Sequence, residues 1–143
     1  MANLERAIVI AAEGHAGQTD KAGAPYILHP LRMMLTFTDE PARIVAVLHD
    51  LVEDCEGWTF ERLRAEGFSE SIVAALDAVT KRDGESYEDF VGRAGGDPVG
   101  RRVKLADLKD NADLARIASP GPADHERIAK YRRAIAQLET SEG

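Results

Sequence analysis

The 143-residue sequence has one cysteine and no long apolar run. A single thiol, at Cys55, can form neither an internal disulfide nor a CxxC motif, which argues against structural zinc held by thiolates. No apolar segment approaches the roughly 18 residues that cross a membrane, and the N-terminus lacks the basic flank and cleavage site of a signal peptide. We therefore expect a cytoplasmic protein that does not associate with membranes.

Positive charge is also scarce. The 25 acidic and 18 basic residues leave a net charge of −7, which argues against nucleic-acid binding through a broad basic surface. A small anionic ligand can bind such an acidic protein only in a local pocket lined by basic residues. The length and the 44% hydrophobic content fit one globular domain over residues 1–143, with a core that needs no disulfide.

Apolar residues recur at helical spacing along the chain, whereas the sustained alternation of a half-buried strand is missing. The sequence therefore predicts an all-α fold. Asn3, Thr59, Ser69 and Ser86 are candidate N-caps, and the Gly- and Pro-rich residues 15–26 predict a loop. The expected helices cover residues 4–14, 30–37, 41–54, 60–66, 70–81, 87–94, 98–116 and about 128–138.

The helix expected over residues 98–116 carries polar side chains on a face that should meet the core. At ~100° per residue, Asp107 and Asn111 point away from the solvated arc. That arc holds three charged residues, Arg102, Lys109 and Asp113. A buried carboxylate needs a cation or strong donors, because an unpaired one costs several kcal/mol or shifts its pKa. An aspartate that caps another helix or pairs with an arginine meets this need as well as a ligand site does.

The stretch VLHDLVED, residues 47–54, loads a core helix with titratable groups. His49, Asp50, Glu53 and Asp54 share the face opposite an apolar arc, and no lysine offsets their charge as one would on an ordinary solvated face. A divalent cation would relieve the repulsion. Imidazole nitrogen together with carboxylate oxygen suits Mn, Fe, Zn or Ni better than the all-oxygen set that Ca prefers.

Residues elsewhere in the chain can complete such a site. Adjacent His49 and Asp50 project ~100° apart on a helix, so both reach one ion only in a groove whose other ligands come from other helices. His29 and Asp107 can supply those ligands. The last two carboxylates of VLHDLVED lie one turn further on, free to orient a water and to transfer protons, as a hydrolase requires. His15 falls on the apolar face of the first helix, where we expect packing rather than ligation.

Four motifs, HAGQTDKAGAPYILHP, VLHDLVED, AVTK and VKLADLKDN, occur in this order. Together they resemble the hydrolase domain of the Rel/Spo family, and most of all the stand-alone small alarmone hydrolases. These are HD-domain metal-dependent phosphohydrolases, and the resemblance spans roughly residues 4–114. It implies a compact helical HD-domain bundle. The implied reaction removes the 3′-pyrophosphate from guanosine 3′,5′-bis(diphosphate), or ppGpp.

The resemblance also implies roles for individual residues. The implied ligands of one Mn²⁺, or of another divalent transition metal, are His29, His49, Asp50 and Asp107. Glu53 and Asp54 are implied to activate the attacking water. The residues implied to contact or lie near the nucleotide are Lys21, Asn111 and Lys81. Such a set is chemically coherent, because the metal supplies Lewis acidity while a lysine offsets the charge of a polyanionic phosphate.

The sequence also departs from the family pattern. Asp20 stands where the family usually has an arginine, and Leu108 replaces a common basic residue. Fewer cations weaken the binding of a highly charged polyphosphate. Two alternatives follow: an HD-domain phosphohydrolase of a less charged nucleotide or phosphorylated cofactor, and a non-catalytic module that senses a nucleotide. The water-activating pair, Glu53 and Asp54, argues against the sensor.

The final amphipathic segment leaves the oligomeric state open. Its apolar residues Ile128, Tyr131, Ile135 and Leu138 can pair two copies of the chain into a homo-oligomer, but a face buried in the chain's own core explains the pattern equally well. No synthetase or regulatory domain follows, so we expect a chain that degrades the nucleotide without making it. The expected partner is a small nucleotide substrate and not a nucleic acid.

Overall fold

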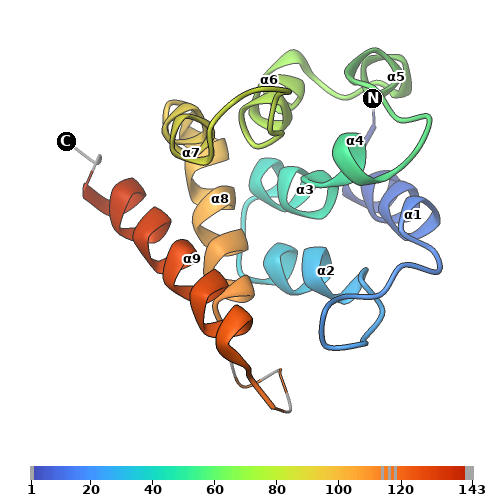
Figure 1. The fold of residues 1–143 in the computed structure, drawn as a ribbon. Helices are drawn as coiled ribbons and strands as arrows, with labels where there is room; N and C mark the ends of the chain where they lie inside the picture. The colour runs from blue at the N-terminus through green and yellow to red at the C-terminus, as the bar shows by residue number, and fades with distance from the viewer. Residues whose placement is uncertain (1, 114, 116, 118, 141–143) are drawn as a thin grey trace.

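The described part of the chain folds as an all-α structure. The computed structural model describes residues 2–113, 115, 117 and 119–140 (Figure 1). The helices are α1 (Leu4–Gly14), α2 (Leu28–Leu35), α3 (Glu40–Leu48), α4 (Leu51–Asp54), α5 (Phe60–Glu66), α6 (Glu70–Ala78), α7 (Tyr87–Gly95), α8 (Pro98–Asn111) and α9 (Pro122–Thr140). Over the described residues, extended pairing is limited to an isolated bridge between Thr19 and Pro25. The expected fold class is confirmed.

The starts of several helices follow the sequence closely. Asn3, Thr59, Ser69 and Ser86 each accept a hydrogen bond from a backbone N–H in the first turn of α1, α5, α6 and α7. These are the four caps that the sequence predicts, and each stabilises its helix by about 1 kcal/mol. Gly67 ends α5 with a φ of 103°, a left-handed conformation that glycine adopts without strain.

Helix α3 lies at the centre of the bundle, packed against α1, α2, α6 and α8 (Figure 1). Residues 44–48 are all buried, as expected of a helix that is apolar on every side. His49 follows α3 directly, so the helix carries this histidine into the core, where it is 2% exposed.

The continuous helix expected over residues 41–54 is wrong, because the chain turns at His49 and Asp50 between α3 and α4. The ring of His49 donates a hydrogen bond from Nδ1 to the carbonyl of Ala46 at 2.7 Å. A continuing α-helix would use that carbonyl for the amide of Asp50. The VLHDLVED stretch therefore comprises the end of α3, a turn at His49 and Asp50, and α4.

Other helix ends also differ from the expected ones, most of all at α9, which begins at Pro122, six residues before the expected start, because proline is tolerated in the first turn of a helix. Helix α2 begins at Leu28, two residues early, and α6 ends at Ala78, three residues early. Helix α8 ends at Asn111, and residues 114 and 116 of its expected extension lie outside the described residues. Boundaries are the part of a helix that sequence patterns fix least, because end turns fray and tighten locally.

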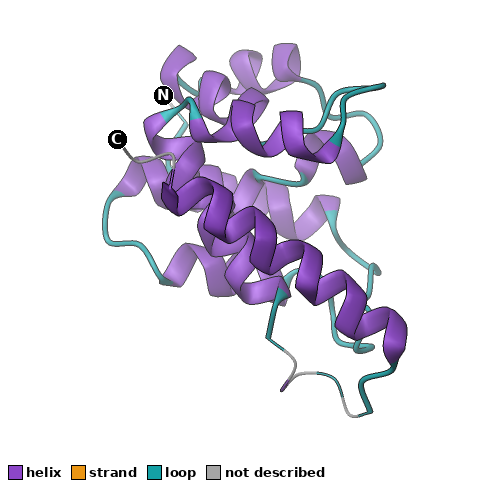
Figure 2. Ribbon diagram, turned by 60° about the vertical axis from the view of Figure 1, so that its left-hand side comes forward, coloured by secondary structure: helices purple, strands orange, loops and turns teal. Residues whose placement is uncertain are grey.

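Helix α9 lies along α7 and α8 and forms one side of the molecule, as the long helix in the foreground of Figure 2. Its Ala134 and Leu138 are buried in a second apolar cluster with Val91 of α7 and Leu108 of α8. The apolar face of this last helix is thus buried within the chain itself. Among the described helices, none combines the length and the hydropathy needed to cross a membrane.

The end of α1 packs closely against α4. A Cβ atom on Gly14 would lie 2.9 Å from Cδ1 of Leu51 and 3.0 Å from Sγ of Cys55. Leu51 and Cys55 are both buried, so neither side chain can move away freely. Glycine at this position therefore sets how near α4 and its carboxylates lie to α1.

We predict that Gly14→Ala lowers the free energy of unfolding by about 1–3 kcal/mol, because the added methyl group overpacks the α1–α4 contact. Gly92→Ala is the matched control: its Cβ would meet Nε2 of Gln137 at 3.7 Å, an ordinary contact. It should raise stability by roughly 0.5–1 kcal/mol through helix propensity. Urea unfolding of both variants measures the difference, and equal effects would contradict the close packing at Gly14.

Candidate functional site

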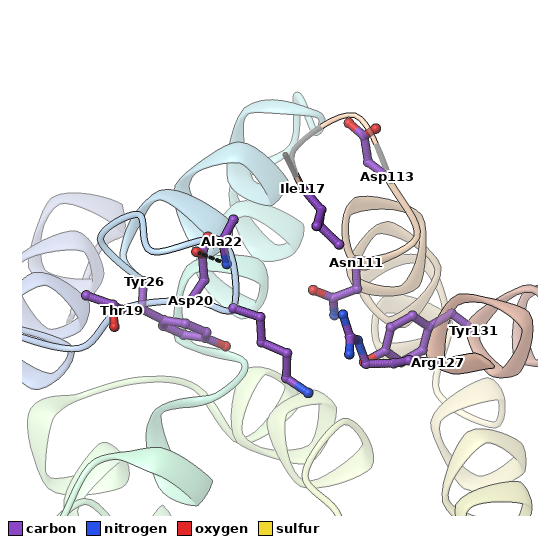
Figure 3. Close-up of a pocket in the computed structure, with 10 residues that line it drawn as sticks. Thr19, Asp20, Ala22, Tyr26, Asn111, Asp113, Ile117, Arg127 and Tyr131 are labelled. Atoms are coloured by element: carbon purple, nitrogen blue, oxygen red, sulfur yellow. Dashed lines mark hydrogen bonds between the residues drawn. The ribbon is translucent and has the colours of Figure 1, made fainter. Parts of the chain in front are cut away.

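A pocket of ≈ 380 Å³ opens between the loop after α1 and the helices α8 and α9 (Figure 3). Tyr26 from the loop faces Arg127 and Tyr131 of α9 across it. Lys21 and Asn111 also line this pocket, so the structure brings together two of the three residues expected to contact a nucleotide. Arg127 and Tyr131 were missed by the sequence analysis because they lie on a helix outside the recognised motifs.

The third expected contact, Lys81, does not line this pocket. It is exposed, and its backbone N–H donates to Oε1 of Glu53 at 3.2 Å. Asp20 lines the pocket, and its Oδ1 accepts hydrogen bonds from the backbone amides of Ala22 and Ala24. This aspartate shapes the loop turn while adding negative charge beside Lys21.

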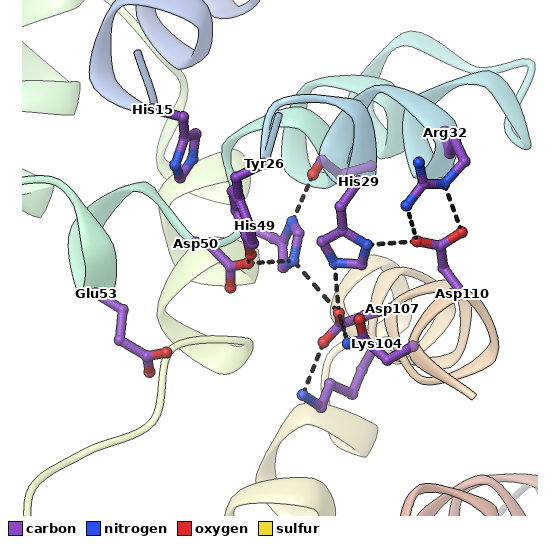
Figure 4. A network of polar contacts seen from close by, with 12 residues as sticks. His15, Tyr26, His29, Arg32, His49, Asp50, Glu53, Lys104, Asp107 and Asp110 are labelled. Atoms are coloured by element: carbon purple, nitrogen blue, oxygen red, sulfur yellow. Dashed lines mark hydrogen bonds and ion pairs between the residues drawn. The ribbon is translucent and has the colours of Figure 1, made fainter. Parts of the chain in front are cut away.

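A cluster of two buried histidines, the buried Asp107 and the half-buried Asp50 adjoins the pocket (Figure 4). His29 comes from α2, His49 and Asp50 from the turn before α4, and Asp107 from α8. One ligand atom from each of the first three lies within 4.8 Å of the others. Oδ1 of Asp107 lies 2.9 Å from Nε2 of His29 and 3.5 Å from Nε2 of His49. The structure therefore gathers all four residues that the sequence named as ligands.

His49 supplies the strongest indication of a bound cation. Because its Nδ1–H donates to a carbonyl, Nε2 is the nitrogen left to face the cluster. This buried Nε2 lies 2.9 Å from Oδ2 of Asp50, but it forms no hydrogen bond of acceptable geometry with any described residue. Burial disfavours a charged ring, yet the carboxylates of Asp50 and Asp107 raise the pKa of His49 well above its ordinary value. An imidazole nitrogen facing two carboxylate oxygens is a set of donors that suits a divalent metal.

Asp107 is the most heavily bonded carboxylate of the cluster. Its Oδ1 accepts hydrogen bonds from Nε2 of His29 and Nδ2 of Asn111, both at 2.9 Å. Its Oδ2 accepts one from Nζ of Lys104 at 3.0 Å. Burial alone would raise the pKa of Asp107, but the charges of Lys104 and His49 hold it well below the usual range. The strong donors that the sequence required for this buried aspartate are present.

His29 is oriented by a second carboxylate. Its Nδ1 lies 2.6 Å from Oδ2 of Asp110, which also pairs with the guanidinium of Arg32 through two bonds of 2.9 Å. Burial lowers the pKa of His29, but the hydrogen bonds to Asp107 and Asp110 raise it overall. A carboxylate behind a histidine fixes the ring so that its other nitrogen can bind a metal. Sequence analysis gave Asp110 no place in the site, because its partners His29 and Arg32 lie on another helix.

Asp50 is fixed by Tyr26, whose hydroxyl donates to its Oδ2. Burial and the charge of Asp50 both raise the pKa of this tyrosine, so the hydroxyl keeps its proton. Tyr26 therefore joins the pocket to the cluster, a contact that the sequence did not predict. His15 packs beside it, with ring centroids 4.9 Å apart, and its Nδ1 lies 2.8 Å from Oε1 of Gln18. As expected, His15 is outside the group of ligand atoms.

Glu53 and Asp54 lie on α4, with Asp50 between Glu53 and His29 in the view of Figure 4. Burial, followed by the charge of Asp50, raises the pKa of both carboxylates. A raised pKa makes a carboxylate a better proton acceptor near neutral pH. The carbonyl of Asp54 accepts a hydrogen bond from Nε2 of Gln18 at 3.2 Å, which ties α4 to the loop after α1.

Comparison with known proteins identifies the family of this chain. A family model for the HD domain matches residues 7–116. The chain belongs to the HD-domain family. It is 33% identical over 120 residues to a guanosine-3′,5′-bis(diphosphate) 3′-pyrophosphohydrolase of Aquifex aeolicus, an alignment covering 76% of this chain and 17% of that protein. It is 35% identical over 126 residues to a GTP pyrophosphokinase of Streptomyces coelicolor, covering 79% of this chain and 15% of that protein.

A solved structure shares the fold of this HD protein. It belongs to a metazoan ortholog of SpoT described as hydrolysing ppGpp, and it matches with a TM-score of 0.77 at 21% identity. The match covers 96% of this chain and 85% of the other. The resemblance inferred from the four motifs is confirmed, although the chain spans only 17% and 15% of the two curated relatives named above.

We predict that Asp110→Asn weakens Mn²⁺ binding by about 10–100-fold, because an amide oxygen orients and polarises the His29 ring less than a carboxylate does. Asp113→Asn is the matched control, since it removes the same charge from an exposed residue close by in the chain. Isothermal titration of the metal-free proteins with Mn²⁺ gives the affinities. Equal affinities in the two variants would contradict a supporting role for Asp110.

Proposed function

We propose that this HD protein hydrolyses a phosphorylated nucleotide with the help of a divalent metal, and that ppGpp is its substrate. The observation that carries the proposal is the buried Nε2 of His49, which faces Asp50 and Asp107 and forms no hydrogen bond with any residue that the structure describes. The pocket that contains Lys21 and Arg127 adjoins this cluster. The 3′-pyrophosphohydrolase name of several relatives supports the choice of substrate.

The residues that would hold the metal are His29, His49, Asp50 and Asp107. Two imidazole nitrogens with two carboxylates suit Mn²⁺, the ion we propose. Such an ion, when bound, polarises the phosphoryl group and lowers the pKa of a coordinated water. Asp110 and Tyr26 would keep the ligands in place through the hydrogen bonds described above.

Glu53 and Asp54 would handle the proton of the attacking water. Their raised pKa suits them to accept it as the water oxygen forms its bond to the phosphorus of the 3′-pyrophosphate. The bond between that phosphorus and the 3′-oxygen then breaks, and the 3′-oxygen takes up a proton to leave as a hydroxyl. The products are pyrophosphate and the nucleotide 5′-diphosphate.

The pocket would hold the rest of the nucleotide. Lys21 and Arg127 can pair with phosphate oxygens, and the rings of Tyr26 and Tyr131 can stack against the base. Arg127 is held by Asp124 at 2.6 Å, which limits how freely it can turn to a ligand.

Negative charge in the pocket favours a second candidate substrate. Asp20 and Asp113 line the same pocket as Lys21 and Arg127, so two carboxylates offset two cations. A nucleotide or phosphorylated cofactor with fewer charges would meet less repulsion there. A sensor without catalysis is disfavoured, because binding alone does not require Glu53 and Asp54 beside the cluster.

We predict that the Mn²⁺-loaded protein releases pyrophosphate from ppGpp. Glu53→Gln should lower kcat by about 10²–10⁴-fold, because the amide cannot accept a proton, while Mn²⁺ affinity remains. Asp50→Ala should lose both activity and metal. Coupled detection of pyrophosphate, beside a panel of simpler nucleotides, is the measurement. Phosphate released only from a simpler nucleotide would refute ppGpp as substrate, and an active Glu53→Gln would refute the role of Glu53.

We predict that Asp20→Asn lowers KM for ppGpp roughly two- to fivefold, because one partly solvated negative charge is removed from the pocket. The asparagine oxygen can still accept from the amides of Ala22 and Ala24, so the loop should keep its turn. Asp89→Asn, an exposed residue outside the pocket, is the matched control and should leave KM unchanged. Steady-state kinetics test this, and an unchanged KM in Asp20→Asn would mean that its charge does not oppose the substrate.

A further inference from the structure

Lys104 is a buried lysine in the middle of the site. It is 7% exposed, and its Nζ lies 3.0 Å from Oδ2 of Asp107 (Figure 4). Fully buried lysines are rare unless they are paired. The function proposed above assigns no task to this ammonium group, although it contacts one of the four residues that would hold the metal.

Two aromatic rings of α7 also lie near the ammonium group. Nζ of Lys104 lies 4.6 Å from the ring centroid of Phe90 and 6.0 Å from that of Tyr87, both on α7. Rings at these distances attract a cation through their faces. Helix α7 and the carboxylate therefore hold the charge of Lys104 at one position.

This fixed ammonium group determines how Asp107 faces the cluster. Oδ2 of Asp107 is taken by Lys104, whereas Oδ1 points to Nε2 of His29 and Nε2 of His49. Oδ1 is thus the oxygen presented to the residues that would share a metal. Without the ammonium group, the carboxylate would lose its main fixed partner on the Oδ2 side.

The ammonium group also balances the charge of Asp107 before any metal arrives. A buried carboxylate left without a cation strongly destabilises a fold. A metal bound by Asp107 would supply positive charge to the same carboxylate, so the lysine and the metal compete electrostatically.

We propose that Lys104 is a positioning residue that substitutes for the charge of the metal in the metal-free protein. It keeps Asp107 buried and turned toward the ligand cluster, and it does so at the expense of metal affinity. This inference rests on the metal centre of the proposed function, but it is independent of which nucleotide is hydrolysed. An ordinary structural ion pair would stabilise the protein equally with and without metal.

The test compares Lys104→Met with wild type in EDTA and in saturating Mn²⁺. Methionine keeps an apolar stem against Phe90 and removes only the charged end. Lys109→Met is the matched control, because it makes the same change at an exposed position of the same helix. Thermal unfolding gives Tm in each condition, and isothermal titration gives the Kd for Mn²⁺.

We expect Lys104→Met to lose about 10 °C or more of Tm in EDTA, because the buried Asp107 carboxylate loses its ammonium partner. Mn²⁺ should restore more than half of that loss, and the Kd for Mn²⁺ should tighten roughly tenfold, since a nearby positive charge is gone. Lys109→Met should behave as wild type. If Lys104→Met is unfolded in EDTA, we expect it to fold when Mn²⁺ is added, and circular dichroism measures this folding.

A second variant separates charge from packing. Adding Asp107→Asn to Lys104→Met removes the carboxylate charge that has lost its ammonium partner, so Tm in EDTA should recover by at least half although metal binding is lost. No recovery would show that lost packing, and not charge, caused the destabilisation, and it would overturn the proposal.

Two further outcomes would also overturn the proposal, and they are distinguishable. Equal losses of Tm with and without Mn²⁺, with an unchanged or weaker Kd, would make Lys104 an ordinary structural ion pair and leave the metal centre intact. A wild-type protein whose Tm does not respond to Mn²⁺ would refute the metal centre itself, and the role of Lys104 would fall with it.

Discussion

The burial of one carboxylate charge, that of Asp107, constrains the structure around it. Water is excluded, so other parts of the chain must supply the donors: His29 from α2, and Lys104 and Asn111 from α8. Nε2 of His49, which follows α3, also lies near Oδ1 of Asp107. A shift of α2 or α3 by one residue would remove His29 or His49 from this carboxylate, which constrains how these helices align with α8.

The apolar core makes this buried polar cluster around Asp107 possible. Because α3 is buried on every side, it delivers His49 to the interior without presenting other polar groups there. The phenyl ring of Phe90 lies against the ammonium group of Lys104. Among the described residues, the acidic chain, with its net charge of −7, thus buries Lys104 beside Asp107 and places Lys21 and Arg127 at the neighbouring pocket.

Much of the fold could be predicted from local signals. The caps at Asn3, Thr59, Ser69 and Ser86 form within a few residues of chain, so their sequence pattern is sufficient. The inward direction of Asp107 follows from helical periodicity alone. The turn at His49 could not be predicted, because the bond that ends α3 comes from the ring of a residue that continues an uninterrupted helical pattern. Lys104 was missed for a related reason: lysine is normally solvated, and its burial depends on rings that α7 brings from elsewhere.

The turn between α3 and α4 divides the VLHDLVED stretch into two parts that have different neighbours. Helix α3 is held by neighbours on all sides, whereas the four-residue α4 contacts the end of α1 and the loop that follows it. Substitutions at the end of α1 or in the loop after it therefore act on Glu53 and Asp54 more directly than on His49, which the core holds. In an evolving lineage, such a division allows the reaction to be retuned for a new substrate without loss of the buried polar network on which folding depends.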